Sequence, residues 1–223
     1  MSRRDLLRLA SPLLSLTLAA CATRGATRHF SPATEAVSRE ALDAWGAIRE
    51  RAGRLPSSRL LYDAKMGRGS VAAVPGSLAV TYTDGEVKRA SLTGPFGSHI
   101  ADYAGGTVTG EDRKAFVVDP EALRSVLAGT WPGTPSTVAG CDGDSCLLVW
   151  DGPPRVSAVV DRIARQTREL SLEGDAGKLV AAYSGSASPW PERIGIREER
   201  SDRTLALKLI AVEPQVSAPS PGR

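Results

Sequence analysis

Most of this chain, from residue 60 to residue 212, breaks into short apolar runs separated by turn-forming residues. Ser77 to Tyr82 is typical, because every second residue in it is apolar. A period of two predicts a strand with one buried face. The connections Asp84-Gly85 and Ser201-Asp202 are short, and connections this short join antiparallel neighbours. The sequence therefore predicts a large antiparallel sheet.

The predicted strands share apolar or β-branched residues between Gly, Pro, Asp or Ser. They cover residues 60–66, 77–82, 87–93, 98–103, 105–109, 114–118, 146–150, 156–163, 168–172, 178–183, 193–198 and 204–212. The stretch 129–140 is rich in Pro, Gly and Thr, and we expect it to be irregular.

A helix is predicted before the first strand. Ser31 is a suitable N-cap and Pro32 fits the first helical position. Apolar residues then recur every three or four positions, which is typical of one face of an amphipathic helix. Pro56 ends the pattern.

A second helix is predicted between the two groups of strands. Asp119 is its N-cap, Pro120 its first residue, and Gly129 ends it. The order of elements shows no strand–helix–strand alternation. The fold class is therefore predicted as α+β, with a curved antiparallel sheet that carries helices on one face, and a β-sandwich with accessory helices is the alternative.

The amino-terminal residues have the layout of a lipoprotein signal. Three arginines lie before an apolar run at 9–20, which ends in the lipobox Leu18-Ala19-Ala20-Cys21. This run is shorter than the roughly 20 residues that a spanning helix needs. We expect residues 1–20 to be removed and Cys21 to be acylated, since two or more acyl chains anchor a domain firmly. A plain signal peptide with a chance cysteine is the alternative.

The remaining chain is long enough for one domain with its own core. We predict an acylated tether at 21–30, a lipid-binding domain at 31–213 and a disordered, Pro- and Ser-rich tail at 214–223. After residue 20 the chain holds 25 basic and 24 acidic residues. No basic block with interleaved aromatic residues is present, so the sequence does not support nucleic-acid binding.

Cys141 and Cys146 form an even pair once Cys21 is assigned to acylation. They flank Asp142-Gly143-Asp144-Ser145, which has the composition of a turn. In an oxidising compartment this spacing predicts a local disulfide. A zinc site needs further ligands, and no His lies nearby.

The sequence shows no recognisable catalytic constellation. Its two histidines, His29 and His99, are far apart in the sequence and lack ligand spacing. There is no nucleophile elbow, phosphate-binding loop, zinc motif or dinucleotide fingerprint. We therefore expect a binding protein that is not an enzyme and needs neither a cofactor nor a metal. An apolar gap between sheet and helices suits an acyl chain, and a fully packed core is the alternative.

The order of these elements resembles the LolA/LolB-like lipoprotein-carrier superfamily, in particular LolB-type outer-membrane lipoproteins. The resemblance runs from Trp45 to Val212. Three pieces carry it: a strand and loop at 90–98, a helix and Gly/Pro turn at 120–133, and 191–194 with the final pair of strands. Two features depart from the family: Phe96 stands where LolB-type proteins have Leu, and the Cys141/Cys146 pair is not a feature of that receptor.

The resemblance implies a curved antiparallel half-barrel, covered by helices on its concave face around an apolar cavity. It implies binding of the acyl chains of lipids or lipoproteins, such as palmitate. A periplasmic lipoprotein carrier is the implied partner, and lipoprotein receipt and insertion at the outer membrane the implied role. The cavity lining that it implies consists of apolar residues on the strands and the second helix: Leu78, Val80, Leu123, Val126, Leu127, Val180, Ile194 and Leu207.

The resemblance also implies a membrane-insertion loop at Pro95, Phe96 and Gly97. We expect a monomer that is lipid-anchored at the periplasmic face of the outer membrane. Ala22, which follows the acylated cysteine, favours that membrane, because Asp at this position is associated with inner-membrane retention in some bacteria. The alternative is a structural or interaction lipoprotein of the envelope with the same fold and no transfer activity.

Overall fold

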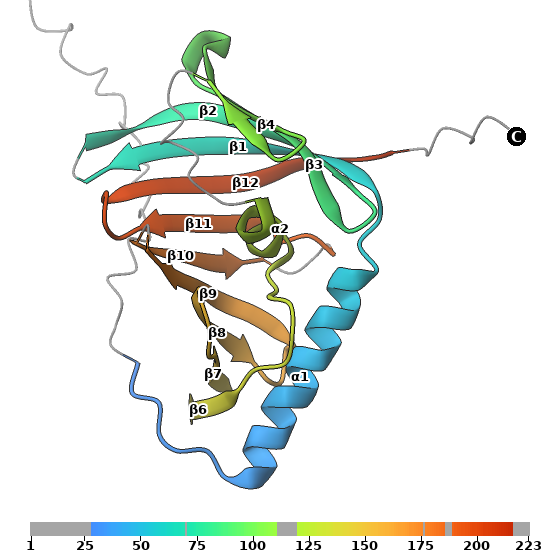
Figure 1. Ribbon diagram of the computed structural model, residues 1–223, viewed down its shortest axis with the longest axis vertical. Coiled ribbons are helices and arrows are strands. Elements are labelled where there is room, and N and C mark those ends of the chain that lie inside the picture. Colours follow the sequence, from blue (N-terminus) through green and yellow to red (C-terminus); the bar gives the residue numbers. More distant parts are fainter. Residues whose placement is uncertain (1–27, 70, 111–119, 176, 186–188, 216–223) are drawn as a thin grey trace, which may run out of the picture.

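The computed structural model describes residues 28–215 except 70, 111–119, 176 and 186–188 (Figure 1). In this part of the chain, alternating strand sequences form one antiparallel sheet of twelve strands. The strands are β1 (Ser58–Arg68), β2 (Val71–Thr83), β3 (Glu86–Thr93), β4 (His99–Ala104), β5 (Thr107–Thr109), β6 (Thr137–Asp142), β7 (Ser145–Trp150), β8 (Arg155–Asp161), β9 (Gln166–Gly174), β10 (Gly177–Ser184), β11 (Arg193–Glu198) and β12 (Arg203–Pro214).

The sheet consists of two meanders that meet at its centre. Its strand order is β5-β4-β3-β2-β1-β12-β11-β10-β9-β8-β7-β6. Every neighbouring pair is antiparallel, and β1 against β12 is the one pair that is not consecutive in the sequence. The sheet does not close, so β5 and β6 are its edges. The predicted α+β fold with a curved antiparallel sheet is confirmed.

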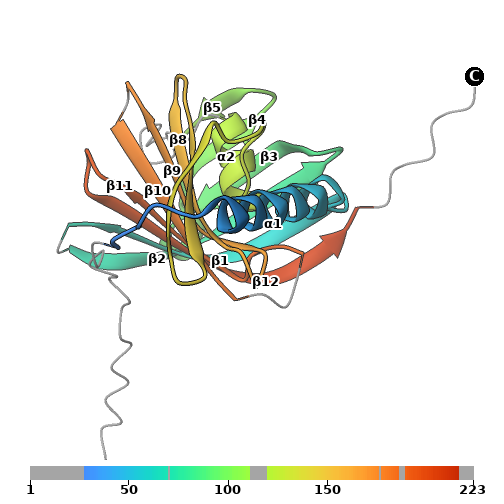
Figure 2. The ribbon, with the colours of Figure 1, turned by 90° about the horizontal axis from the view of Figure 1, so that it is seen from below.

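Two helices lie on the concave side of the sheet (Figure 2). α1 (Glu35–Gly53) precedes β1 and packs on β6, β8 and β9. α2 (Pro120–Ala128) lies in the connection between the two edge strands and contacts β3. The indole ring of Trp45 in α1 packs edge-on against that of Trp150 in β7, with ring centroids 4.9 Å apart. These contacts leave α1 over one half of the sheet and α2 near its middle.

The start of α1 differs from the prediction. Its N-cap is Thr34, whose hydroxyl accepts from the backbone N–H of Val37 at 3.4 Å. Ser31 instead pairs with Cys141 of β6, through backbone hydrogen bonds of 3.0 and 2.8 Å. Because this pairing holds Ser31 extended, the helix begins after it.

The strand prediction needs two additions. β2 begins at Val71, six residues before the predicted strand at 77–82, because pairing with β1 carries the strand through Pro75 and Gly76. β6 lies within 129–140 and just beyond it, where the abundance of Pro, Gly and Thr predicts an irregular chain. Pairing with β7 overrides this weak local preference. The predicted strand at 114–118 and the predicted N-cap Asp119 lie outside the described residues. The last strand, β12, ends at Pro214, two residues after the end of the predicted strand at 204–212.

Candidate functional site

An apolar pocket of about 400 Å³ lies between α2 and the concave face of the sheet. Twelve of its seventeen lining residues are aliphatic or Met. The apolar lining residues are Met66, Val71, Ala72, Val74, Leu78, Leu92, Ile100, Leu123, Leu179, Ile196, Leu205 and Leu207. A concave site with this lining and size is typical of a small-molecule or acyl-chain pocket.

Both meanders of the sheet and α2 build the pocket. Leu78 and Leu92 pair across β2 and β3, and Leu207 lies on β12. Leu123 reaches the pocket from α2. The side of the concave face that α1 covers contributes none of the lining, so the space lies where the helix layer is thinnest.

Three residues of the predicted lining lie at the pocket: Leu78, Leu123 and Leu207. Four others, Val80, Val126, Leu127 and Ile194, are buried in the core and do not line it. The side chains of these four residues point into the space between sheet and helices, as predicted. They lie deeper in that interface, where neighbouring side chains fill the space. Periodicity identifies a buried face but not the place along it where packing fails.

Val180 lies on the opposite face of β10, which corrects the prediction. Leu179 lines the pocket and Ala181 is fully buried in the core. Because side chains alternate along a strand, Val180 points to the convex side. A prediction that is wrong by one residue along a strand selects a side chain on the opposite face of the sheet.

The mouth of the pocket lies at the joined ends of β1 and β2. Arg68 and Val71 flank this turn, and both line the pocket. Glu198 and Arg203 face them from the β11–β12 connection. Val71 is 69% exposed and Val74 is 41% exposed, so the apolar lining continues onto the surface.

Side-chain hydrogen bonds hold α2 and the turn after it over the sheet. The phenol hydroxyl of Tyr183 in β10 donates to the carbonyl oxygen of Val126 at 2.8 Å. The hydroxyl of Thr167 in β9 donates to the carbonyl oxygen of Gly129 at 2.6 Å. Burial raises the pKa of the Tyr183 phenol far above its usual range, so this group stays a hydrogen-bond donor. The lid over the pocket is therefore fixed at its carboxyl-terminal end.

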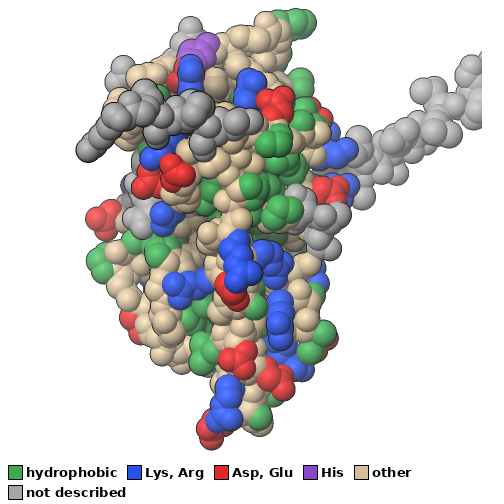
Figure 3. Space-filling view, turned by 90° about the vertical axis from the view of Figure 1, so that its right-hand side faces the viewer, with side chains coloured by type: hydrophobic (Ala, Val, Ile, Leu, Met, Phe, Trp, Pro, Cys, Tyr) green, Lys and Arg blue, Asp and Glu red, His purple; other side chains and the backbone are tan. Residues whose placement is uncertain are grey.

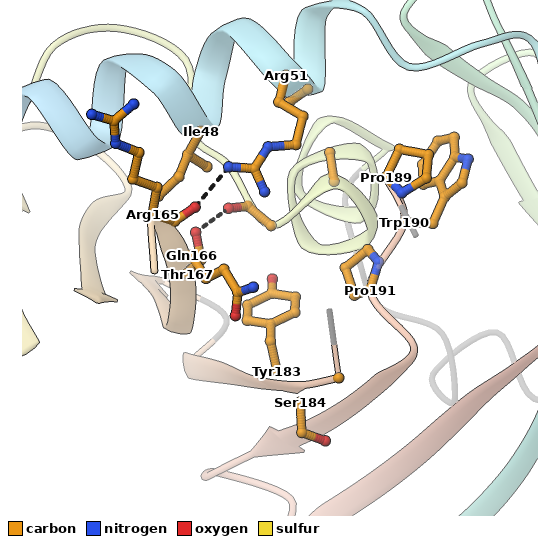
Figure 4. A pocket seen from close by; sticks show the side chains of 14 residues that line it. Ile48, Arg51, Arg165, Gln166, Thr167, Tyr183, Ser184, Pro189, Trp190 and Pro191 are labelled. Atoms are coloured by element: carbon orange, nitrogen blue, oxygen red, sulfur yellow. Dashed lines mark hydrogen bonds between the residues drawn. The ribbon is translucent and has the colours of Figure 1, made fainter. Parts of the chain in front are cut away.

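A second, smaller pocket lies between the end of α1, the end of α2 and the β9–β10 strands (Figure 4). Arg51 donates to the carbonyl oxygen of Arg165 at 2.8 Å across its rim. Its volume of about 70 Å³ holds roughly two waters at about 30 Å³ each, which is too little for an acyl chain. Arg and Lys side chains gather on this side of the molecule, over α1 (Figure 3). α1 carries the exposed Arg49, and its C-cap is the exposed Arg54.

The predicted insertion loop forms a turn, Pro95–Gly97, between β3 and β4. Phe96 is fully exposed, at 108% relative accessibility, which rules out its burial in the core. Its backbone is left-handed, with φ 58°, a conformation that is unfavourable for a bulky side chain. The turn follows Thr93, which pairs with Ser77 of β2, so Phe96 lies at the same end of the sheet as the pocket mouth.

Cys141 and Cys146 face each other across the β6–β7 hairpin and form a disulfide with an S–S distance of 2.07 Å. The bridge closes the turn 142–145. The backbone of Cys141 also pairs with Ser31, so the bridged hairpin holds the segment that leads to α1. Cys21, the predicted acylation site, lies outside the described residues.

The described residues hold no group of three or more His, Cys, Asp or Glu side chains with metal-binding geometry. His99 pairs with Asp102 on the same strand at 3.0 Å. None of the described helices is both long and apolar enough to cross a membrane.

Comparison with known proteins rests on the fold. No family model matches the sequence, and no curated protein matches it significantly. A crystal structure of a LolA superfamily protein from Nitrosomonas europaea superposes with a TM-score of 0.53 at 10% identity, over 78% of this chain and 94% of that one. A putative outer membrane lipoprotein-sorting protein domain from Vibrio parahaemolyticus superposes with a TM-score of 0.51 at 11% identity, over 80% and 94%.

These two likenesses extend over nearly the whole of both relatives, at identities that carry information about the fold alone. They agree with the resemblance that the order of motifs indicates. The chain therefore shares the overall fold of these two structures.

Proposed function

We propose that this chain is an envelope lipoprotein that holds acyl chains of lipids or lipoproteins in the apolar pocket under α2. The pocket itself supports this proposal most strongly. It joins about 400 Å³ of apolar space to an exposed apolar mouth, in a fold shared with a lipoprotein-sorting domain. Its lining offers apolar contact along a chain, and its few charged groups lie at the mouth, where a polar head group remains in water.

The proposal assigns no chemistry to the pocket. Its polar lining residues are Arg68, Glu198, Arg203 and Thr204, and they do not form a nucleophile–base pair. The protein is therefore proposed as a carrier or receptor and not as an enzyme. Its action is to exclude water from a bound chain and to release the chain at a membrane.

Binding of a fluorescent fatty acid tests the pocket. We expect saturable binding in the micromolar range, about −8 kcal/mol. Ala72 and Ala73 are exposed neighbours on β2, and only Ala72 lines the pocket. Ala72→Trp is expected to weaken binding by narrowing the mouth, whereas Ala73→Trp leaves the affinity unchanged. Equal effects of the two substitutions, or no saturable binding, contradict the proposal.

The same proposal places the anchor at Cys21 and the protein on the periplasmic face of the outer membrane. Mass spectrometry of the mature amino terminus tests this part. An acylated Cys21 is the expected terminus, and Cys21→Ser is expected to leave unprocessed precursor. An unmodified residue other than Cys21 at the mature terminus contradicts the anchor.

Transfer to the outer membrane, with a periplasmic carrier as donor, is the finer part of the proposal. The fully exposed Phe96 beside the pocket mouth supports it. The competing function is a structural envelope lipoprotein with the same fold. It predicts that the protein binds fatty acid weakly or not at all and does not speed movement of an acylated protein into liposomes.

A further inference from the structure

The first half of β2 has an unusual surface. Val71, Ala72, Ala73, Val74 and Pro75 follow one another without a polar residue, and all five are exposed. A strand of a soluble protein has at least one polar face when it is exposed on both sides, so a run of this kind indicates a function. Three of the five, Val71, Ala72 and Val74, also line the acyl pocket.

This apolar segment, 71–75, extends past the end of the neighbouring strand. β3 ends at Thr93, opposite Ser77, and the chain then leaves the sheet through the Phe96 turn. On its other side the segment pairs with β1, from Lys65 to Arg68. The segment is thus a projecting edge of the sheet, with the pocket on one side and Phe96 close by.

We propose that the segment 71–75 lies in the membrane interface together with Phe96, so that the pocket opens directly into the bilayer. This inference deepens the proposed function and rests on it. An acyl chain then passes between bilayer and pocket along continuous apolar surface. Val71, Ala72 and Val74 line the pocket at its mouth, and in this orientation they also contact the membrane.

The chain length before the described residues agrees with this orientation. Six residues lie between an acylated Cys21 and Arg28, so seven Cα–Cα steps of about 3.6 Å span at most about 25 Å. The described chain begins beside β6, where Ser31 pairs with Cys141, and the blue segment starts on the left in Figures 1 and 2, the same side as the β1–β2 turn. A tether of this length therefore keeps this end of the strands within reach of the membrane.

The backbone groups of the segment 71–75 limit how deeply the segment can enter the membrane. Backbone groups of 71–75 that face away from β1 have no partner on β3 in the described pairing. Such groups are not tolerated in the hydrocarbon core but find partners among water and head groups. The segment is therefore placed at the head-group boundary, the depth at which amphipathic surface segments bind.

A site-directed fluorescence experiment tests the location. Full-length protein extracted from the envelope is reconstituted in liposomes of phosphatidylethanolamine and phosphatidylglycerol, with an environment-sensitive dye on Ala73→Cys or Ala104→Cys. Ala104 is the matched control, because it is an exposed Ala that pairs with Arg89 of β3 at the end of β4 away from the Phe96 turn. We expect a blue shift and quenching by nitroxide lipids at position 73 only. Equal signals at both positions, or no signal at position 73, overturn the proposal.

A transfer experiment separates this inference from the proposed function. Ala73→Asp leaves the pocket lining intact, so its affinity for a soluble fluorescent fatty acid is expected to stay unchanged. Its rate of delivery of an acylated protein to liposomes is expected to fall several-fold, and Ala104→Asp is expected to behave as the unmodified protein. Unchanged delivery by Ala73→Asp overturns the membrane contact. A dye at position 73 that responds to the donor protein and not to liposomes, together with loss of delivery by Ala73→Asp, assigns the segment to a protein partner. This result also overturns the proposed membrane contact.

Failure of fatty-acid binding in the unmodified protein instead removes the proposed function itself. Because that measurement contains no membrane, its outcome does not depend on whether the segment 71–75 contacts one. The two failures are therefore distinguishable.

Discussion

The hydroxyl of Tyr183 on β10 donates a hydrogen bond to the carbonyl oxygen of Val126 in α2, across 2.8 Å. The two residues are 57 positions apart in the sequence, and their contact fixes the helix that covers the pocket. A few such contacts position α2, because it is only nine residues long and isolated helices of this length are not stable.

Removal of this hydroxyl is expected to loosen the lid. Tyr183→Phe should lower the free energy of unfolding by about 1 kcal/mol, the usual net contribution of one hydrogen bond. Thermal or urea unfolding measures it. Tyr62→Phe is the matched control, since the buried Tyr62 hydroxyl has no hydrogen-bond partner in the described part of the chain, and its removal is expected to be neutral or stabilising. Equal destabilisation by both variants contradicts this account of the lid.

Asp161, the last residue of β8, is expected to make the free energy of unfolding depend on pH. The carboxylate of Asp161 accepts from the backbone N–H of Ala164 at 2.7 Å and of Ile163 at 3.1 Å, and pairs with Arg168 at 2.7 Å. The hydrogen bond from Ala164, and then those from Arg168 and Ile163, lower the pKa of Asp161 and outweigh the opposing effect of burial. The folded protein therefore binds this proton more weakly than the unfolded chain does.

A lowered folded-state pKa gives stability that is present above the unfolded value, near pH 4, and is lost as the pH falls through the folded value. Asp161→Asn should thus cost about 2 kcal/mol at neutral pH, the range for hydrogen bonds to a charged group. The difference from the unmodified protein should shrink in acid. Unfolding curves between pH 7 and pH 2 measure it, and a difference that is constant over this range contradicts the assignment.

The Cys141–Cys146 bridge closes a loop of six residues, so its expected stabilisation is modest, about 2 kcal/mol. Replacement of both cysteines by Ala should lower the unfolding free energy by this amount without changing the fold. Thiol counting on the denatured, unreduced chain should find neither sulfur reactive. Two reactive thiols from this pair exclude the bridge in the isolated protein.

Phe96 has a left-handed backbone and a fully exposed ring, so the folded protein gains little from the side chain. Phe96→Gly should raise the unfolding free energy by up to about 1 kcal/mol, since Gly adopts positive φ without steric cost. The same change should slow delivery of an acylated protein to liposomes. Ile163→Gly is the control, because Ile163 is an exposed apolar residue of the β8–β9 turn, away from the pocket mouth. Normal delivery by Phe96→Gly contradicts a membrane role for the loop.

The sequence predicts the architecture better than the pocket. Alternation over 77–82 predicts the second half of β2, and Asp84-Gly85 predicts the turn that follows it, but the first half of β2, from Val71, lies outside the predicted strand. β6 has no such signal, because its pairing with β7 overrides a composition typical of loops. Similarly, the pairing of Ser31 with Cys141, more than a hundred residues away, moves the start of α1 to Thr34.

The pocket depends on where two packed layers fail to meet, which a linear pattern does not contain. The resemblance places the strands of Leu78 and Leu207 around the pocket, and both residues line it. Val80 lies on the same strand as Leu78, and Ile194 pairs with Leu207, yet both are fully packed. The sequence does not predict the mouth, although the uninterrupted apolar run at 71–75 is visible in it. The run at 71–75 is exposed because β3 ends at Thr93 and does not pair with it. Where β3 ends depends on the assembled sheet and not on a local sequence signal.

The central claim is that an acyl chain occupies the space under α2. Photo-crosslinking with a diazirine-bearing fatty acid, followed by peptide mapping, tests it most directly. The account predicts that labels concentrate on peptides that hold Leu123, Ile196 and Leu207, and that excess unlabelled fatty acid removes them. Labels spread over the surface, or confined to the exposed Phe96 turn and insensitive to competitor, contradict an occupied pocket.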